Sequence, residues 1–296
     1  MAGSHIKRTI GERIFDVFNV ILMIVLMLLM LYPFWHIIMY SFSEVHLAMK
    51  GGLFLWFRGF TLETYKTILR NPTVASGFKV SVIVTVVGTL YATFFTATTA
   101  YPLSKKRLKG RGFFSFYVLF TMLFNGGMIP TYLLVKNLGL IDNILAHILP
   151  GAIGAWNIFI MRNFFAGIPE SLEESARIDG ASDLLIFFKI IIPLSKAVLA
   201  TIGLFVAVGY WNNYFSTILY INSRDLWSLQ AVLREIITST EEAMKRQGIT
   251  VTHAQTITSQ SVISANIVIA TVPILIVYPF CQKYFIKGVM VGSVKG

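Results

Sequence analysis

The sequence predicts an all-α integral membrane protein with six transmembrane helices. Of its 296 residues, 55% are hydrophobic and only 13% are charged, and the mean hydropathy is +0.70. Soluble globular domains carry about 25% charged residues, so this composition places most of the chain in lipid. The apolar residues also fall into separate blocks of about 20 residues, the length that a helix needs to cross a bilayer.

The first apolar block, from about Val17 to Tyr40, is expected to be a retained membrane span. It is too long for the apolar core of a signal peptide, and no small-residue cleavage pattern follows it. We expect residues 1–14 to form a cytoplasmic N-terminus and residues 15–296 to form a single transmembrane domain.

Five further apolar blocks have the length and composition of membrane spans. They lie at residues 80–103, 113–135, 144–163, 197–219 and 262–282. With six spans, both termini lie on the same side of the membrane.

Lysine and arginine set the orientation of these spans. Of the 25 Lys and Arg residues, 15 fall on the side that holds the termini, and five of these lie in the short loop from Lys105 to Arg111. Positive residues concentrate in cytoplasmic loops, so both termini are predicted to be cytoplasmic. Basic loops that face anionic lipid also explain much of the net charge of +11 without a nucleic-acid partner.

Two longer stretches, about 41–78 and 220–261, are then expected outside. In the second stretch, apolar and charged residues alternate at helical spacing from Leu226 to Gln247. This pattern predicts an external amphipathic helix, which we interpret as a cover for the bundle and not as a catalytic element.

The segment EESARIDGASDLLIFFKIIIP, residues 173–193, places six charges between two apolar runs and belongs to a predicted cytoplasmic loop of about 166–193. Ser171 and Glu174 have the spacing of a capping box, which predicts a short helix from about Leu172 to Ile178. Gly180 is suited to end that helix because glycine adopts left-handed backbone geometry without strain.

A second short helix is expected directly after this glycine. Ser182 can cap it, and Pro193 is expected to end it, because proline disfavours helical geometry in the residue before it. The loop is therefore predicted to be a helix, a bend and a helix. Small residues at Ser175 and Ala176 leave a narrow face on the first helix that another protein can approach closely.

At these residues the chain resembles the membrane permease subunits of binding-protein-dependent ABC importers. Their cytoplasmic loop carries the pattern E-A-A, three residues, G, nine residues, I-x-L-P. Here Glu174-Ser175-Ala176, Gly180 and Ile190-x-Ile192-Pro193 match every spacing, with Ser for the first Ala and Ile for Leu. IDGAS, WNNY at 211–214 and the closing QKYFIKGVMVGSVKG are similar to the carbohydrate branch, especially to the second permease of maltose-like systems and to permeases for larger or acidic oligosaccharides such as alginate.

The resemblance implies the type I permease fold of ABC importers, a multi-pass location in the bacterial cytoplasmic membrane, and import of an oligosaccharide by alternating access. It also implies that the loop is a coupling helix that docks in a cleft of an ATP-binding subunit, where the motif Glu meets a basic residue. The implied partners are a second permease in a heterodimer, two ATP-binding subunits and an extracytoplasmic solute-binding protein. The expected coupling residues are Glu173, Glu174, Ser175, Ala176, Arg177, Asp179, Gly180 and Pro193.

Catalytic and cofactor motifs are missing from the sequence. No G-x-x-x-x-G-K-[ST] loop occurs, so we expect ATP and Mg²⁺ to be bound by partner subunits and not by this chain. H-E-x-x-H and G-x-S-x-G are also missing, the five histidines show no ligand spacing, and the one cysteine, Cys281, has no partner in the chain. We therefore expect a transport subunit without a metal site, not an enzyme.

Polar residues inside the predicted spans are candidates for a substrate path, because polar side chains in lipid normally face the bundle interior or an aqueous cavity. Aromatic rings beside amides suit a sugar, which offers C–H faces for stacking and hydroxyls for hydrogen bonds. The same residues can instead serve interfacial belts or helix packing. The candidates are Asn125, Asn157, Trp211, Asn212, Asn213, Tyr214 and Asn266.

Two other functions remain open from the residues alone. A permease for a non-sugar solute would share the coupling motif, although an oxyanion substrate would favour Arg or Lys within the spans, and the candidate positions are neutral. A membrane assembly scaffold could use Glu174 and Gly180 only to cap an interfacial helix pair.

Overall fold

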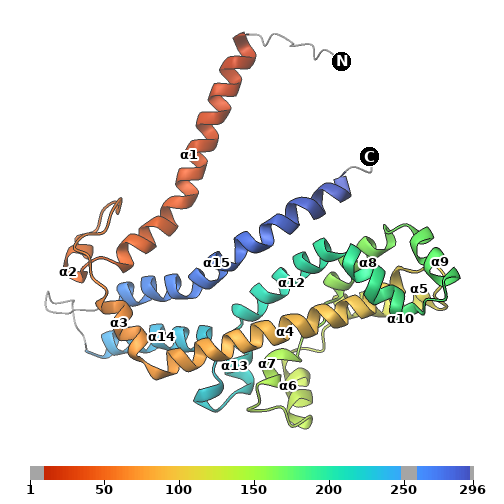
Figure 1. Cartoon of the computed structure of the whole chain (residues 1–296). Coiled ribbons are helices and arrows are strands. Elements are labelled where there is room, and N and C mark those ends of the chain that lie inside the picture. Colours follow the sequence, from red (N-terminus) through yellow and green to blue (C-terminus); the bar gives the residue numbers. More distant parts are fainter. Residues whose placement is uncertain (1–9, 248–258, 294–296) are drawn as a thin grey trace. The chain divides into compact units, whose positions relative to one another are not determined.

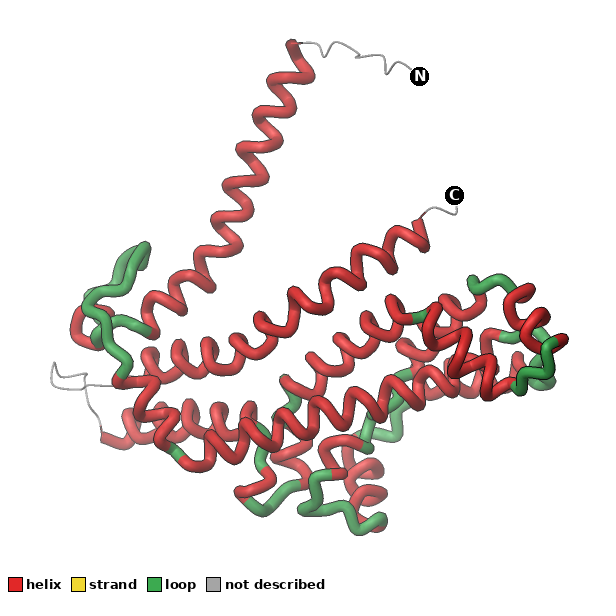
Figure 2. Tube along the Cα trace, in the orientation of Figure 1, coloured by secondary structure: helices red, strands yellow, loops and turns green. Residues whose placement is uncertain are grey.

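The computed structural model describes residues 10–247 and 259–293, and every regular element in that part of the chain is a helix (Figure 1, Figure 2). Outside the helices, these residues contain one isolated β-bridge, between Ser43 and Phe60. The all-α class predicted from composition is therefore confirmed.

The chain divides into two compact units. One comprises residues 1–68 and 237–269, and the other comprises residues 69–236 and 270–296. The first unit holds α1 (Ile10–Ser41), α2 (Val45–Ala48) and most of α3 (Glu63–Arg70), whereas α14 (Leu229–Gln247) and α15 (Ser259–Ser293) each pass from one unit into the other. The second unit holds α4 (Pro72–Ser104), α5 (Arg111–Leu123), α6 (Met128–Asn137), α7 (Leu145–Ile148), α8 (Ala155–Ala166), α9 (Glu170–Ile178), α10 (Asp183–Ile186), the π-helical turn Phe187–Ile191, α11 (Ile192–Leu194), α12 (Lys196–Trp211), α13 (Phe215–Tyr220) and the 3-10 turn Arg224–Leu226.

Three unbroken helices are long and apolar enough to cross a membrane: Ile10–Ser41, Pro72–Ser104 and Gln260–Pro279. They match the first, second and sixth expected spans, and the first begins earlier than predicted. Apolar side chains along the first are exposed in the isolated chain, as lipid-facing residues are. Two pairs of helices are bent at a short break: α5 with α6, by 111°, and the segment Asp183–Leu194 with α12, by 80°. If each bent pair is one span, the number of candidate spans rises from three to five.

The sequence NGGMIP, residues 125–130, predicts a broken helix within the third expected span, and the chain does leave helical geometry there. The helix stops at Leu123 and restarts at Met128, and the intervening Asn125 side chain accepts a hydrogen bond from the Gly127 N–H at 2.8 Å. Gly127 has a φ of 88°, a left-handed geometry that glycine adopts easily. The sequence NGG therefore ends one helix and turns the chain into the next.

The fourth expected span, 144–163, does not form one continuous helix. The short α7 ends at Ile148, and α8 starts only at Ala155 and is 12 residues long. Pro150 lacks an N–H for helical bonding, and Gly151 has a φ of 73°, so the chain leaves helical geometry between them. Twelve residues rise about 18 Å, less than the bilayer core of about 30 Å.

The core of the second unit forms where α4 packs against α8 and α12. Small residues permit this contact: a Cβ added at Gly88 would lie 2.7 Å from the Tyr210 ring, and Gly203 lies beside Thr89 and Thr93. The Tyr210 hydroxyl donates a hydrogen bond to the Ile148 carbonyl at 2.8 Å. The spacing of small residues at Gly203 and Ala207 predicts close helix packing, and Gly203 makes such a contact. The same spacing at Gly151 and Ala155 predicts one too, but Gly151 has open space around it and serves the turn after α7 instead.

The amphipathic helix expected in 220–261 is confirmed as α14; residues 248–258 of that range lie outside the described residues. Its first N–H groups have no partner within the helix, and Ser81 of α4 supplies one, since its hydroxyl oxygen accepts from the Leu229 N–H at 2.8 Å. Gly77 allows this approach, because a Cβ there would lie 3.2 Å from the Leu229 Cα. The start of α14 is thus fixed to α4.

Candidate functional site

The first helix of the predicted coupling loop is α9, and its start differs from the prediction. The helix begins at Glu170 with Pro169 as its N-cap, and the cap makes no side-chain hydrogen bond. The capping box expected between Ser171 and Glu174 is therefore wrong, because both residues already lie inside the helix. Glu170 and Glu173 in the first turn instead place negative charge at the positive end of the helix dipole.

The end of α9 follows the prediction closely. Gly180 has a φ of 80°, its N–H donates to the Arg177 carbonyl at 3.0 Å, and the Ala181 N–H donates to the Ala176 carbonyl at 2.9 Å. These two bonds form a Schellman motif, which requires a left-handed residue at the position of Gly180. Asp179 is the C-cap residue. The bend between the two short helices is thus fixed by the backbone.

The second helix starts as predicted and ends slightly later. The Ser182 hydroxyl oxygen accepts from the Leu185 N–H at 3.3 Å and caps α10. The chain then passes through a π-helical turn, Phe187–Ile191, and remains helical through Pro193 to Leu194. Wider π-helical bonding is one way to accommodate a residue that lacks an N–H. The 80° bend into α12 follows at Ser195.

The two adjacent glutamates of α9 have opposite environments. Glu173 is buried, with its side chain 4% exposed, whereas Glu174 and Ser175 are exposed. Ile178 is 86% exposed, so α9 also presents an apolar side chain at its surface. Ala176 points inward and packs against the core of α4, α8 and the π-helical turn. Of the two small residues expected to form a narrow exposed face, only Ser175 is therefore exposed.

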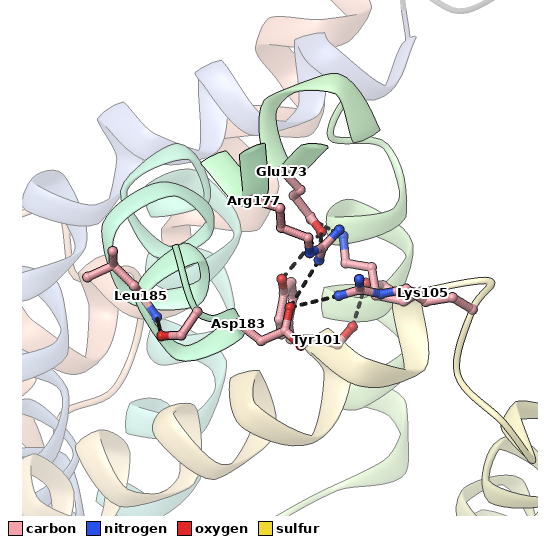
Figure 3. A network of polar contacts seen from close by, with 9 residues as sticks. Tyr101, Lys105, Glu173, Arg177, Asp183 and Leu185 are labelled. Carbon is pink, nitrogen blue, oxygen red and sulfur yellow. Dashed lines mark hydrogen bonds and ion pairs between the residues drawn. The ribbon is translucent and has the colours of Figure 1, made fainter. Parts of the chain in front are cut away.

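Glu173 belongs to a network of charged and polar side chains inside the second unit (Figure 3). Its Oε1 is paired with Lys105 Nζ, and its Oε2 accepts from the Tyr101 hydroxyl at 3.4 Å and from Arg177 at 3.3 Å. Arg177 also donates to Asp183 at 3.0 Å, and Arg107 donates to the same carboxylate at 2.8 Å. The network connects the end of α4 and the loop after it with α9 and α10.

Arg177 is the member of this network that bridges the two short helices. Partial burial alone would lower the pKa of Arg177, but the hydrogen bond and charge of Asp183, with the charge of Glu173, raise it above its ordinary value. The guanidinium is therefore charged at every physiological pH.

A hollow of about 280 Å³ opens on the loop surface, lined by residues on both sides of the bend, including Ala176, Asp179, Gly180, Leu185 and Lys189.

Sequence reasoning missed the residues that hold this loop in place. Lys105 and Arg107 contributed only to the prediction of orientation, and Tyr101 and Asp183 were not considered as site residues. The available signal was that a basic loop and an acidic loop were both expected on the same face of the membrane. Opposite charges on one face can pair, but the sequence alone does not say which ones meet.

The candidate substrate-path residues are not gathered in one place by the structure. Trp211 is buried, donates from Nε1 to the Ala270 carbonyl at 2.9 Å, and lines an apolar hollow of about 200 Å³ beside Phe78. Asn213 Oδ1 accepts from the Ser216 N–H at 3.1 Å at the start of α13. Asn266 is buried and lies in the other unit. The remaining four candidates are exposed or half-buried: Asn125, Asn157, Asn212 and Tyr214.

Trp211 and Asn213 therefore have structural partners within the chain. Tyr214 lies beneath a cation, since the Arg234 guanidinium carbon is 4.2 Å from its ring centroid. Asn212 is the exposed amide of the WNNY sequence.

Comparison with known proteins gives consistent matches along the whole chain. The sequence model of the family described as "Binding-protein-dependent transport system inner membrane component" matches residues 1–291. Protein LplC of Bacillus subtilis is 47% identical over 298 residues, covering 100% of both chains. The polygalacturonan/rhamnogalacturonan transport system permease protein YtcP of the same organism is 45% identical and covers 96% of this chain and 99% of its own length.

A solved structure has the same fold. A chain from the crystal structure of a bacterial ABC transporter involved in the import of the acidic polysaccharide alginate aligns with a TM-score of 0.83 and 35% identity. The alignment covers 94% of this chain and 99% of that one. A more distant relative, the arabinooligosaccharides transport system permease protein AraQ of Halalkalibacterium halodurans, is 29% identical over 90% of this chain and 91% of its own length.

Proposed function

Because this chain belongs to the family of binding-protein-dependent transport system inner membrane components, we propose that it carries an acidic oligosaccharide across the bacterial cytoplasmic membrane as one permease subunit of an ATP-driven ABC importer. A member of this family is a transport subunit and not an enzyme, and ATP is hydrolysed by its partners. ATP and Mg²⁺ accordingly belong to the partner subunits.

The sugar preference is supported by two relatives that match nearly the whole chain. YtcP is named for polygalacturonan and rhamnogalacturonan, and the structural neighbour belongs to an importer of acidic alginate. Galacturonan is a chain of uronic acids, so both substrates carry carboxylates. The relative named for arabinooligosaccharides is less similar, at 29% identity.

The proposed arrangement has six spans with both termini cytoplasmic and a single transmembrane domain from residue 15 to 296. The positive loop from Lys105 to Arg111 supports this orientation. The external stretch 220–261, with α14, then faces the solute-binding protein. A second, different permease completes the pathway, and two ATP-binding subunits cover the cytoplasmic face.

The observation that carries the coupling role is the exposed side of α9. Glu174 and Ser175 face outward from a helix whose first turn is held by the pair of Glu173 with Lys105, and Ile178 offers an apolar contact beside them. We propose that this face enters the cleft of an ATP-binding subunit, with Glu174 meeting a basic residue. The remaining motif residues shape the bend and hold the loop: Glu173, Ala176, Arg177, Asp179, Gly180 and Pro193.

Transport then uses two states, with the pathway open inward or outward. ATP binding draws the ATP-binding subunits together, and the docked loop moves with them. The loop must stay bound in both states, because a coupling element that detaches can no longer bias the equilibrium between them. Asn125, Asn157, Trp211, Asn212, Asn213, Tyr214 and Asn266 stay the proposed substrate-path residues.

Uptake competition in cells that carry the whole importer tests this function. Labelled tetragalacturonate should enter, unlabelled oligogalacturonates should compete, and arabino-oligosaccharides in equal excess should not. Deleting the gene for this chain should abolish entry. Uptake that survives the deletion, or competition only by neutral sugars, would overturn the acidic-oligosaccharide assignment.

A further inference from the structure

A buried ion pair connects the end of α4 to α9. Lys105 directly follows α4, and Glu173 lies in the first turn of α9; their side chains are 10% and 4% exposed. Lys105 Nζ also lies 4.9 Å from the ring centroid of Tyr101, one helical turn earlier. Because Tyr101 and Arg177 occupy the second carboxylate oxygen, both oxygens of Glu173 are bound within the chain (Figure 3).

A second, more exposed set of contacts extends this connection to α10. Arg107 and Arg177 share the carboxylate of Asp183, whose side chain is 67% exposed. Exposed pairs of this kind contribute little by themselves. The pair of Lys105 with Glu173 is different, because separating it leaves the buried Lys105 ammonium without a carboxylate, while Glu173 keeps Arg177 on its own helix. Among these polar contacts, it is therefore the one whose loss costs most when α9 moves away from α4.

From this geometry we infer that Lys105 and Glu173 form the joint through which movement of the coupling loop reaches α4. α4 is 33 residues long and packs against α8 and α12. A movement of its C-terminal end therefore also moves the core of the second unit, where these three helices meet. This inference rests on the proposed function, in which the ATP-binding subunit moves α9. Lys105 and Glu173 are positioning residues: Glu174 faces the partner, and Glu173 holds the helix that carries it.

The test uses the purified complex with its second permease and ATP-binding subunits. Three variants probe the joint: Glu173→Gln, Lys105→Met, and the reversed pair Glu173→Lys with Lys105→Glu. Lys106→Met and Glu170→Gln are matched controls, because these exposed residues neighbour the pair along the chain. Two quantities are measured: co-purification of the ATP-binding subunits, and the ratio of ATPase activity with and without binding protein loaded with tetragalacturonate.

We expect both single variants to co-purify with the ATP-binding subunits while the stimulation ratio falls about tenfold, a change typical of coupling between distant sites. The reversed pair should recover most of the ratio, and the controls should keep it. A merely structural role predicts instead a parallel loss of assembled complex. Unchanged stimulation in both single variants would overturn the inference.

Glu173→Asp covers the case in which the neutral variants fail to assemble. Aspartate keeps the charge but withdraws the carboxylate by one methylene, so the joint should loosen and the ratio should fall; a normal ratio would overturn the inference. Glu174→Lys separates this inference from the proposed function. If Glu174→Lys loses stimulation while the Lys105 and Glu173 variants keep it, only the joint is wrong. If Glu174→Lys also keeps it, the docking of α9 is wrong.

Discussion

At the scale of single residues, adjacent positions in α9 have different environments. Glu173 is enclosed by Lys105, Tyr101 and Arg177, whereas Glu174 meets no partner group in the hydrogen bonds and ion pairs found among the described residues. Sequence spacing identified the motif but treated both glutamates as docking residues. A shift of one residue changes the helix face by about 100°, and only packing against α4 shows which face is inward.

Glu174 gives the first prediction. Glu174→Lys should leave membrane insertion intact and abolish oligosaccharide uptake, because reversing the charge places like charges together at the docked face. The control is Glu170→Lys, an exposed glutamate on the same helix, which should transport normally. Uptake by whole cells, with the amount of inserted protein measured by immunoblot, checks the prediction. Full uptake by the Glu174 variant contradicts it.

Gly180 gives a second prediction. Gly180→Ala should destabilise the folded chain by about 1–2 kcal/mol, the cost of a left-handed backbone for a residue with a Cβ. No heavy atom lies within 4 Å of the position of that Cβ, so the effect comes from the backbone alone. Gly180→Asn should cost less, because asparagine tolerates this geometry better. Thermal unfolding of the purified variants measures the difference, and equal Tm values for alanine and glycine would disprove this account.

Asp142 joins two loops and gives a prediction about pH. Its carboxylate accepts from the Asn222 and Ser223 N–H groups and from the Ser223 hydroxyl, at 3.0, 2.8 and 2.5 Å. The Ser223 hydroxyl and N–H lower the pKa of Asp142 below its ordinary 3.8. The ionised carboxylate therefore stabilises the fold above pH 3.8, and this contribution is lost as the pH falls through the lowered pKa.

Asp142→Asn isolates this charge, because asparagine also tolerates the φ of 59° found at this position. The variant should melt at a lower temperature than the wild type at neutral pH, and the difference in Tm should shrink in acid below pH 3.8. A difference that stays constant with pH would show that the charge is not responsible.

At the scale of elements, the contact between α4 and α12 depends on the absence of a side chain at Gly88. The Tyr210 ring occupies the space that a Cβ would need, and its hydroxyl is bonded to Ile148. The sequence predicted close packing at Gly203 correctly, but Gly88 lies in a run of small and β-branched residues and gave no separate signal. The partner of a small residue is visible only in the folded chain.

Gly88→Ala should therefore destabilise this contact by about 1–3 kcal/mol, as overpacking of a filled core does. Adding Tyr210→Leu should recover part of the loss, because the shorter side chain vacates the space beside position 88. The control Gly112→Ala adds a methyl group where no heavy atom lies within 4 Å. Thermal unfolding checks all three, and a Gly88→Ala variant as stable as the control would contradict the packing.

At the scale of the whole molecule, composition predicted the all-α membrane class, and the coupling pattern predicted the family. Three of the expected spans coincide with unbroken helices that are long and apolar enough to cross a membrane, and two more coincide with bent pairs of helices, because apolar blocks report length and hydrophobicity. The fourth does not, since Pro150 and Gly151 interrupt helical geometry inside an apolar block. The ion pair of Lys105 and Glu173 connects residues 68 positions apart, and local patterns do not encode such a pairing.

The central claim is that α9 enters an ATP-binding subunit. A photo-crosslinking amino acid at Ser175, which is exposed on α9, tests it most directly in the assembled importer. We predict a crosslink to the ATP-binding subunit from position 175, and none to that subunit from Ser223, which belongs to the stretch expected on the opposite side. Efficient labelling of only lipid or the second permease from position 175 would contradict the claim.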